Sequence, residues 1–250
     1  MLAPRLDELA KDLGTGRELP LDLTRLCREL GVGLRVERAD GRRRGALMTR
    51  GRRMEVVVMR DHDRPVPISG QERFTIAHEL GHFLILNEVH ILPQRESEYW
   101  LLEELCNRFA SALLIPDSVV ADVPEPVCAA DVAEAVNAVA RRADVTAEPA
   151  ARVLVARFRT PVAIGSFRID PLGSTTRLGF RGWWAESRVW WGGRGGRRLA
   201  VYSNHPLAPV LEAMVTLRRG ETAAPPVDGA TSTFLRQRGR DTASFAAVLA

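Results

Sequence analysis

His78-Glu79-Leu80-Gly81-His82 is the stretch of this 250-residue sequence that carries the most information about fold and function. On an α-helix, residues four positions apart lie on one face, one turn apart. Two imidazoles at that spacing can bind one metal ion from a single rigid element, and Glu79 beside them can reach a water on that ion. The pentapeptide therefore predicts a zinc-dependent hydrolase with His78 and His82 as metal ligands and Glu79 as general base.

The residues before the motif predict where its helix begins. Ser69 is a favoured N-cap, and Glu72 three residues later completes a capping box. Apolar residues then recur at helical spacing, and the pattern ends near Asn87. The motif thus lies in the middle of a helix with a well-defined start, where the geometry of the two histidines is fixed.

The third ligand distinguishes the classes of zinc protease. A catalytic zinc ion takes three protein ligands and leaves one position for water. In the metzincin pattern a glycine and a third histidine follow the second histidine at set spacings, but Ile85 and Glu88 occupy these positions. His90 lies too far along the chain, in a predicted loop. A glutamate on a later helix is the remaining kind of ligand.

The helix predicted over 97–115 supplies that glutamate. Its candidates are Glu98, Glu103 and Glu104. Glu103 is preferred because it shares a face with Asn107, and the small residues at 110–112 would allow close approach to the histidine helix. Glu104 is rotated by about 100° from Glu103 and is the second choice.

The predicted mechanism follows from this ligand set. Zinc lowers the pKa of its water toward about 7, Glu79 takes the proton, and the same carboxyl passes it to the leaving amine. The residue that would stabilise the oxyanion is left open among Tyr99, His90, Tyr202 and the arginines.

Charge and cysteine usage narrow the class of protein. The net charge is +4 and the pI is near 9.5, which is compatible with nucleic-acid binding. Lys11 is the one lysine among many arginines, however, and such a bias more often reflects a GC-rich genome. Cys27, Cys106 and Cys128 are odd in number and widely spaced, so they predict neither a disulfide framework nor a cysteine zinc site. The mixed N-terminus and the lack of a run of about 18 apolar residues predict a cytoplasmic protein.

The remaining pattern is of mixed type. A helix is expected over 20–31 with Gly31 at its C-terminal end, followed by strands over 32–37, 46–49 and 54–59 joined by a turn at 51–53. Alanine-rich helices over 129–143 and 146–158 flank an Asp144-Val145 turn and look like a small helix-turn-helix. Beyond Pro161 we expect strands over 162–168, 175–180, 187–191 and 198–202, and a last helix over 206–218.

Four of the five tryptophans gather in the C-terminal part, at 183, 184, 190 and 191. They can form a sensing or substrate-binding pocket. The simpler interpretation, which we favour, is that they fill the core of a small β-rich domain.

Two segments resemble a known family, the ImmA/IrrE metallopeptidases. Residues 73–83, Arg-Phe-Thr-Ile-Ala-His-Glu-Leu-Gly-His-Phe, are similar to the family's zinc helix. Residues 103–116 are similar to its second signature, in which a glutamate precedes an Asn, a Phe-Ala pair and a Leu-Leu-x-Pro end. The resemblance covers roughly 15–160 and implies His78, His82 and Glu103 as zinc ligands, with Glu79 as the base.

The resemblance also implies a fold and a biological role. The fold would be α+β, with a zincin-like peptidase domain over 1–118 and a helical helix-turn-helix-like module over 119–160. Beyond the resemblance, the sequence pattern itself predicts a β-rich module over 161–222 and a flexible tail over 223–250. The cofactor would be one zinc ion, with manganese as the alternative. The protein partner would be a helix-turn-helix repressor or antitoxin, whose cleavage controls transcription or a stress response.

Two other functions stay open at this point. The first is a DNA-binding regulator that keeps the zinc fold for structure or sensing, motivated by the basic pI and the helices at 131–158. The second is a component of a toxin system that holds a partner without cutting it. Glu79 speaks against the first, because a structural metal site needs no general base.

Overall fold

The computed structural model describes residues 2–38, 44–60, 67–89, 93–172, 175–184, 198–200, 209, 222–224, 230–236 and 242–249. Helices and strands occur in separate groups along these residues, which confirms the α+β class. The chain forms two compact units, one of residues 1–122 with 139–150 and one of residues 123–138 with 151–250. Within the described part, no helix has the length and apolar character required to cross a membrane.

A three-stranded sheet lies in the first unit. Its strands are β1 (Gly33–Arg38), β2 (Gly45–Arg50) and β3 (Arg53–Arg60), in the order β1-β3-β2. β1 runs parallel to β3, and β2 returns antiparallel through a turn at Gly51, whose φ of 64° favours glycine. The central strand buries three consecutive valines at 56–58. These strands confirm the predicted ones to within a residue or two.

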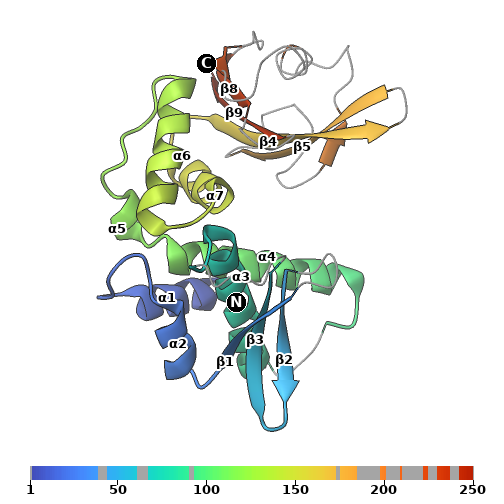
Figure 1. Cartoon of the computed structure of the whole chain (residues 1–250). Helices are drawn as coiled ribbons and strands as arrows, with labels where there is room; N and C mark the ends of the chain where they lie inside the picture. The colour runs from blue at the N-terminus through green and yellow to red at the C-terminus, as the bar shows by residue number, and fades with distance from the viewer. Residues whose placement is uncertain are drawn as a thin grey trace. The chain divides into compact units, whose positions relative to one another are not determined.

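Helices pack on this sheet in layers. They are α1 (Leu2–Gly14), α2 (Leu23–Glu29), α3 (Gly70–Val89), α4 (Glu96–Leu114) and the short α5 (Asp117–Val120). α3 contacts β2 and β3 and α4 packs against α3, as Figure 1 shows. The helix predicted over 20–31 is shorter than expected, since Asp22 caps it by accepting from the Arg25 backbone N–H at 2.9 Å.

α1 was not predicted from the sequence. It buries Leu6 and Ala10 and packs against α4, where its Asp7 pairs with Arg108. The sequence does carry the amphipathic pattern of this helix, since helical spacing separates Leu2, Leu6, Leu9 and Leu13.

The start of α3 is fixed by the predicted capping box and by close contact between Gly70 and the turn at Val145. Ser69 N–H donates to Glu72 at 2.7 Å, and Glu72 N–H donates to Ser69 Oγ at 3.3 Å. A Cβ added at Gly70 would lie 2.9 Å from the carbonyl carbon of Val145, so only glycine allows this approach. Val145 belongs to the turn between α6 (Ala129–Ala143) and α7 (Ala147–Arg157), which confirms the two predicted helices.

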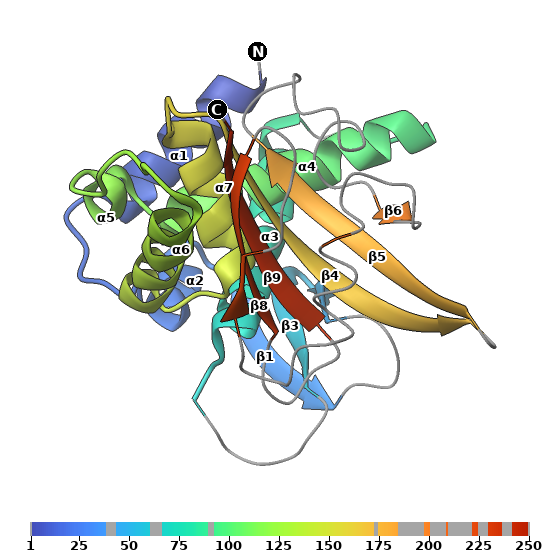
Figure 2. The ribbon, with the colours of Figure 1, turned by 90° about the horizontal axis from the view of Figure 1, so that it is seen from above.

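The second unit contains an antiparallel sheet. Its strands are β4 (Val162–Leu172), β5 (Thr175–Trp184), β6 (Arg198–Ala200), β7 (Thr222–Ala223), β8 (Ala230–Arg236) and β9 (Thr242–Leu249), in the order β6-β5-β4-β9-β8-β7. Figure 2 shows β4, β5, β8 and β9 side by side. The prediction of a flexible tail over 223–250 was wrong for β8 and β9. β9 pairs with both β4 and β8, so its backbone groups are satisfied within the sheet despite the polar and small residues around it.

Several predictions fall on residues outside the described part. They are the strand at 187–191, Trp190 and Trp191, and the helix at 206–218 apart from Pro209. Trp183 and Trp184 end β5, and both interpretations of the tryptophans stay predictions.

Candidate metal centre

α3 presents the two histidines of the motif toward one point. The rings of His78 and His82 have centroids 4.8 Å apart and planes at 74°, and their Nε2 atoms lie 3.1 Å apart. Both side chains are mostly buried, at 14% and 17% exposed. The one-turn spacing expected from the sequence is therefore realised within a regular helix.

α4 brings Glu103 to the same point. Its Oε2 lies 3.4 Å from His78 Nε2 and its Oε1 lies 3.2 Å from His82 Nε2. The three residues form the one group of His, Cys, Asp and Glu side chains in the described part that is arranged to hold a metal ion. The two imidazoles, through hydrogen bonds and charge, hold the pKa of the Glu103 carboxyl well below its usual range.

The distances between these groups are compatible with a shared metal ion. Three ligands about 2.0–2.2 Å from a tetrahedral ion lie roughly 3.3–3.6 Å apart. The two Nε2 atoms lie 3.1 Å apart, and one oxygen of Glu103 lies 3.4 Å from His78 while the other lies 3.2 Å from His82. Two nitrogens and a carboxylate also leave a fourth position for water, as a catalytic site needs.

Gly81 allows α3 and α4 to meet closely. A Cβ at this position would lie 3.2 Å from both Cys106 Cα and Phe109 Cδ1. This close contact lies one turn before the small residues at 110–112, whose role in the approach stays a prediction, and the glycine within the motif permits it.

Asn107 orients the first histidine. Its Oδ1 lies 3.1 Å from His78 Nδ1. An amide oxygen only accepts, so this contact favours a proton on Nδ1 and leaves Nε2, which lies toward Glu103 and His82, as the nitrogen that would bind a metal. Such a partner fixes the tautomer that a metal requires. The sequence placed Asn107 on the face of Glu103 but did not predict this contact.

Glu79 points to a different neighbour, strand β2. A Cβ at Gly45 would lie 3.6 Å from Glu79 Oε1, and a hydrogen bond from the Leu47 backbone favours the charged carboxylate. Burial nevertheless raises the pKa of Glu79, and the Glu103 charge adds to that rise, while His78 and His82 oppose it. Glu79 is thus half-buried between the histidine helix and an edge strand.

Other predicted candidates lie apart from this cluster or outside the described part. Glu104 is exposed and belongs to no metal-binding group in the described residues. Tyr99 lies one turn before Glu103 and is 45% exposed. His90 and Tyr202 are not described. The structure therefore brings Glu103, and not Glu104, to the two histidines, and the oxyanion donor stays open.

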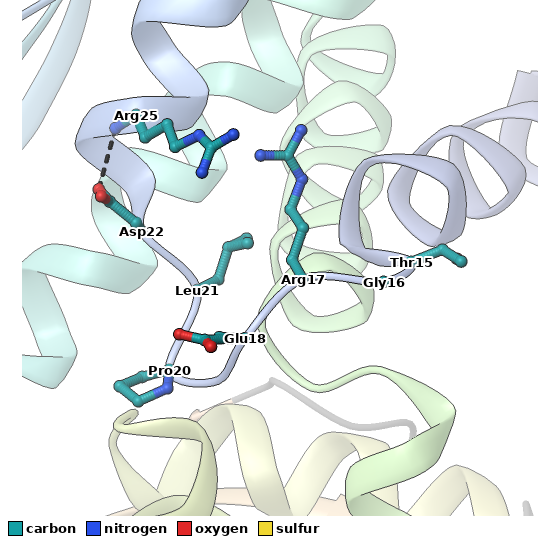
Figure 3. A pocket seen from close by; sticks show the side chains of 8 residues that line it. All are labelled: Thr15, Gly16, Arg17, Glu18, Pro20, Leu21, Asp22 and Arg25. Atoms are coloured by element: carbon teal, nitrogen blue, oxygen red, sulfur yellow. Dashed lines mark hydrogen bonds between the residues drawn. The ribbon is translucent and has the colours of Figure 1, made fainter.

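A separate cavity of about 640 Å³ lies between α1 and α2 and contains none of these residues. Figure 3 shows Arg17 and Arg25 facing each other across it. Both guanidinium groups pair with Glu29, at 2.6 and 2.8 Å, and Asp22 caps α2 beside them. The charges of this cavity are balanced by its own side chains.

Known proteins that are similar to this chain in sequence are metallopeptidases, which agrees with the cluster of possible metal ligands. Residues 27–154, just over half of the chain, match the model of a peptidase family, the IrrE N-terminal-like domain. The chain is 36% identical over 98 residues to the radiation response metalloprotease IrrE of Deinococcus deserti, covering 37% of this chain and 34% of that protein. The corresponding protein of Deinococcus radiodurans is 33% identical over 98 residues, covering 37% and 29%. The matches thus span about a third of these relatives.

A solved structure shares the fold over most of the chain. A Mycobacterium tuberculosis transcriptional regulator superposes with a TM-score of 0.58 at 17% identity, covering 98% of this chain and 76% of that one. At this identity the likeness concerns the fold alone. With the family model matched across the residues of the metal centre, the chain belongs to the IrrE N-terminal-like family of metallopeptidases.

Proposed function

We propose that the protein is a zinc-dependent endopeptidase that cleaves a specific protein. The observation that carries the proposal is the convergence of His78, His82 and Glu103 on one point, with ligand atoms close enough to share a metal ion and Glu79 beside them. In this proposal the first three residues are the metal ligands and Glu79 is the general base. A nitrogen-and-carboxylate ligand set of this kind suits zinc, and manganese is the alternative.

In this proposal Glu79 and Asn107 have distinct roles. A bound zinc ion would supply Lewis-acid chemistry, which polarises the scissile carbonyl and makes water more acidic. Glu79 accepts a proton from the attacking water and delivers it to the leaving amine, so one carboxyl serves both halves of the reaction. Asn107 holds the His78 ring so that Nε2 faces the ligand cluster. The bond broken is a peptide bond, and water supplies both the hydroxyl and the proton.

Strand β2 supports an extended polypeptide as the substrate. It lies at the edge of the described three-stranded sheet, beside the Glu79 carboxylate. An edge strand offers backbone N–H and C=O groups with which an extended peptide can pair. A polypeptide bound there would pass next to the general base.

We propose a helix-turn-helix repressor or antitoxin as the protein that is cut. The support is indirect: the IrrE relatives are described as radiation response metalloproteases, and the fold neighbour is described as a transcriptional regulator. Cleavage of a repressor would change transcription irreversibly until new repressor is made, which suits a stress response.

The α6–α7 pair supports a packing role more than it supports the alternative function, direct DNA binding. The turn between these helices packs on the start of α3, where Arg73 donates to the Leu21 carbonyl at 2.9 Å and lies 3.5 Å from Asp144. A turn that is tied to the peptidase core has a packing role. Salt-dependent binding to duplex DNA by the purified protein would revive the alternative.

Co-expression with the helix-turn-helix proteins encoded beside this gene tests the proposal. Mass spectrometry should find one of them cut in the presence of the wild-type protein and intact with Glu79→Gln, while both forms hold zinc. Cleavage that persists with Glu79→Gln would overturn the assignment of the base. Absence of stoichiometric metal would overturn the proposal as a whole.

A further inference from the structure

The face of α4 that carries Glu103 continues beyond the metal centre. Tyr99 and Trp100 lie three and four residues after Glu96, and Glu103 and Asn107 follow one and two turns later, so these side chains share a helix face. Its C-terminal part meets α3, through Asn107 and Glu103. Its N-terminal part begins one turn away from the metal centre.

That N-terminal part is exposed and apolar. Tyr99, Trp100 and Leu101, named here the α4 patch, are 45%, 61% and 61% exposed. They are three of the six large apolar side chains found exposed among the described residues, and they are consecutive. Isolated exposed apolar residues are normal, but two adjoining exposed aromatic rings are typical of binding surfaces. Leu101 is turned about 100° further round the helix than Trp100, so the two rings carry the patch.

The two aromatic rings are held in place. The Trp100 ring meets the Tyr99 ring edge to face, with centroids 5.3 Å apart and planes at 74°. Trp100 Nε1 also donates to Glu96 Oε1 at 3.2 Å. A rigid aromatic surface loses little conformational entropy when a partner binds, which favours affinity.

The surroundings of the α4 patch are acidic, although the chain as a whole has a net charge of +4. Apart from Glu103, whose charge a bound zinc ion would neutralise, residues 95–104 contain three glutamates and a single arginine. Glu98 also caps the helix, accepting from Gln94 and Arg95 backbone N–H groups at 2.9 and 3.2 Å. The partner that complements this surface carries positive charge beside apolar side chains.

We propose that the α4 patch is a docking surface for a basic, apolar segment of the protein substrate, and that it helps to select the cleavage site. The inference rests on the proposed function and adds the chemistry of the substrate. Side chains on a helix lean toward its N-terminus, so the patch begins about one turn, roughly 5.4 Å, from Glu103. An extended peptide advances about 3.3 Å per residue. A segment that runs along α4 therefore binds about two residues from the cleaved bond.

Peptide binding to the zinc-loaded Glu79→Gln protein tests the proposal. The probe is a fluorescent peptide of about ten residues, roughly 33 Å when extended, that alternates arginine and leucine. One comparison peptide has glutamate in place of arginine, and another has serine in place of leucine. Fluorescence anisotropy should show the arginine–leucine peptide binding at least about tenfold more tightly than either comparison peptide.

Matched variants locate the binding. Trp100→Ser with Leu101→Ser should weaken binding of the arginine–leucine peptide about tenfold, since aromatic anchors dominate such surfaces. Val127→Ser is the control, because Val127 is 86% exposed and lies in the other unit. It should leave the affinity unchanged. Thermal unfolding should be unaffected by all three substitutions, since the side chains are exposed.

The outcomes separate this inference from the proposed function. If zinc is bound but the three peptides bind equally, or the patch variants bind like wild type, the docking surface is wrong and the peptidase proposal stands. Tighter binding of the glutamate peptide also overturns the inference, because it reverses the charge preference. If the protein holds no zinc, the proposed function fails, whatever the peptides do.

Discussion

Replacing Gly81 by alanine perturbs the metal centre without touching a ligand. In an isolated helix the change would stabilise by about 1 kcal/mol, because alanine forms helix better than glycine. Here the new Cβ would lie 3.2 Å from Cys106 Cα, and a backbone atom cannot rotate away. Overpacking of this kind costs about 1–3 kcal/mol, so the net expectation is a loss of about 0–2 kcal/mol.

The effect on metal affinity should exceed the effect on stability. Relief of the contact requires α3 and α4 to separate by a few tenths of an ångström, and this movement carries Glu103 away from the two histidines. Metal sites tolerate distance errors of only about 0.2 Å. We therefore expect zinc affinity to fall about 10–100-fold, the range seen when support of a ligand is lost.

Zinc competition with a fluorescent chelator and urea unfolding would measure the two quantities. Gly14→Ala is the control, because a Cβ there would meet its nearest neighbour, the Leu113 carbonyl, at an ordinary 3.7 Å. It should leave zinc affinity unchanged. Wild-type zinc affinity in Gly81→Ala, together with equal or greater stability, would refute the reasoning about helix approach.

Three further predictions concern the residues that support the site. Asn107→Ala should lower zinc affinity about 10–100-fold with little change in unfolding, because His78 loses the partner that fixes its tautomer; competition with a chelator checks this. The pKa of Glu72 lies below its usual value: burial alone would raise it, but hydrogen bonds from Arg60 help to lower it by more. The Glu72 carboxylate therefore contributes stability that is present above about pH 4.5 and lost as the pH falls through the folded pKa. Urea unfolding should accordingly show Glu72→Gln less stable than wild type by about 1 kcal/mol at neutral pH, with the gap closing in acid; an equal gap at both would contradict it. Arg73→Leu should cost about 1–3 kcal/mol and speed proteolysis at the α6–α7 turn, and unchanged proteolysis would count against the tie described there.

The residues of the site could be predicted because their constraints are local. Two histidines one turn apart, a capping box at Ser69 and Glu72, and a glutamate on the face of Asn107 are all visible within single helices. Each of these features depends on spacing along one element. The sequence could therefore name the side chains that the structure brings together.

The contacts between elements could not be predicted in the same way. The meeting of Gly81 with α4, of Glu79 with β2, and of Gly70 with the α6–α7 turn depends on how separate elements pack. A glycine has no side chain whose pattern would indicate a partner. β9 likewise becomes regular by pairing with β4 and β8, a long-range feature that its own residues do not indicate.

Metal content per chain tests the central claim most directly. Inductively coupled plasma mass spectrometry of the purified protein should find one zinc ion per chain in wild type and in Glu104→Gln, which alters the neighbouring exposed glutamate. Glu103→Gln should lose most of that zinc, because it removes the carboxylate that lies 3.2 and 3.4 Å from the two histidines. Equal zinc in the Glu103 and Glu104 variants, or no zinc in wild type, would contradict the account.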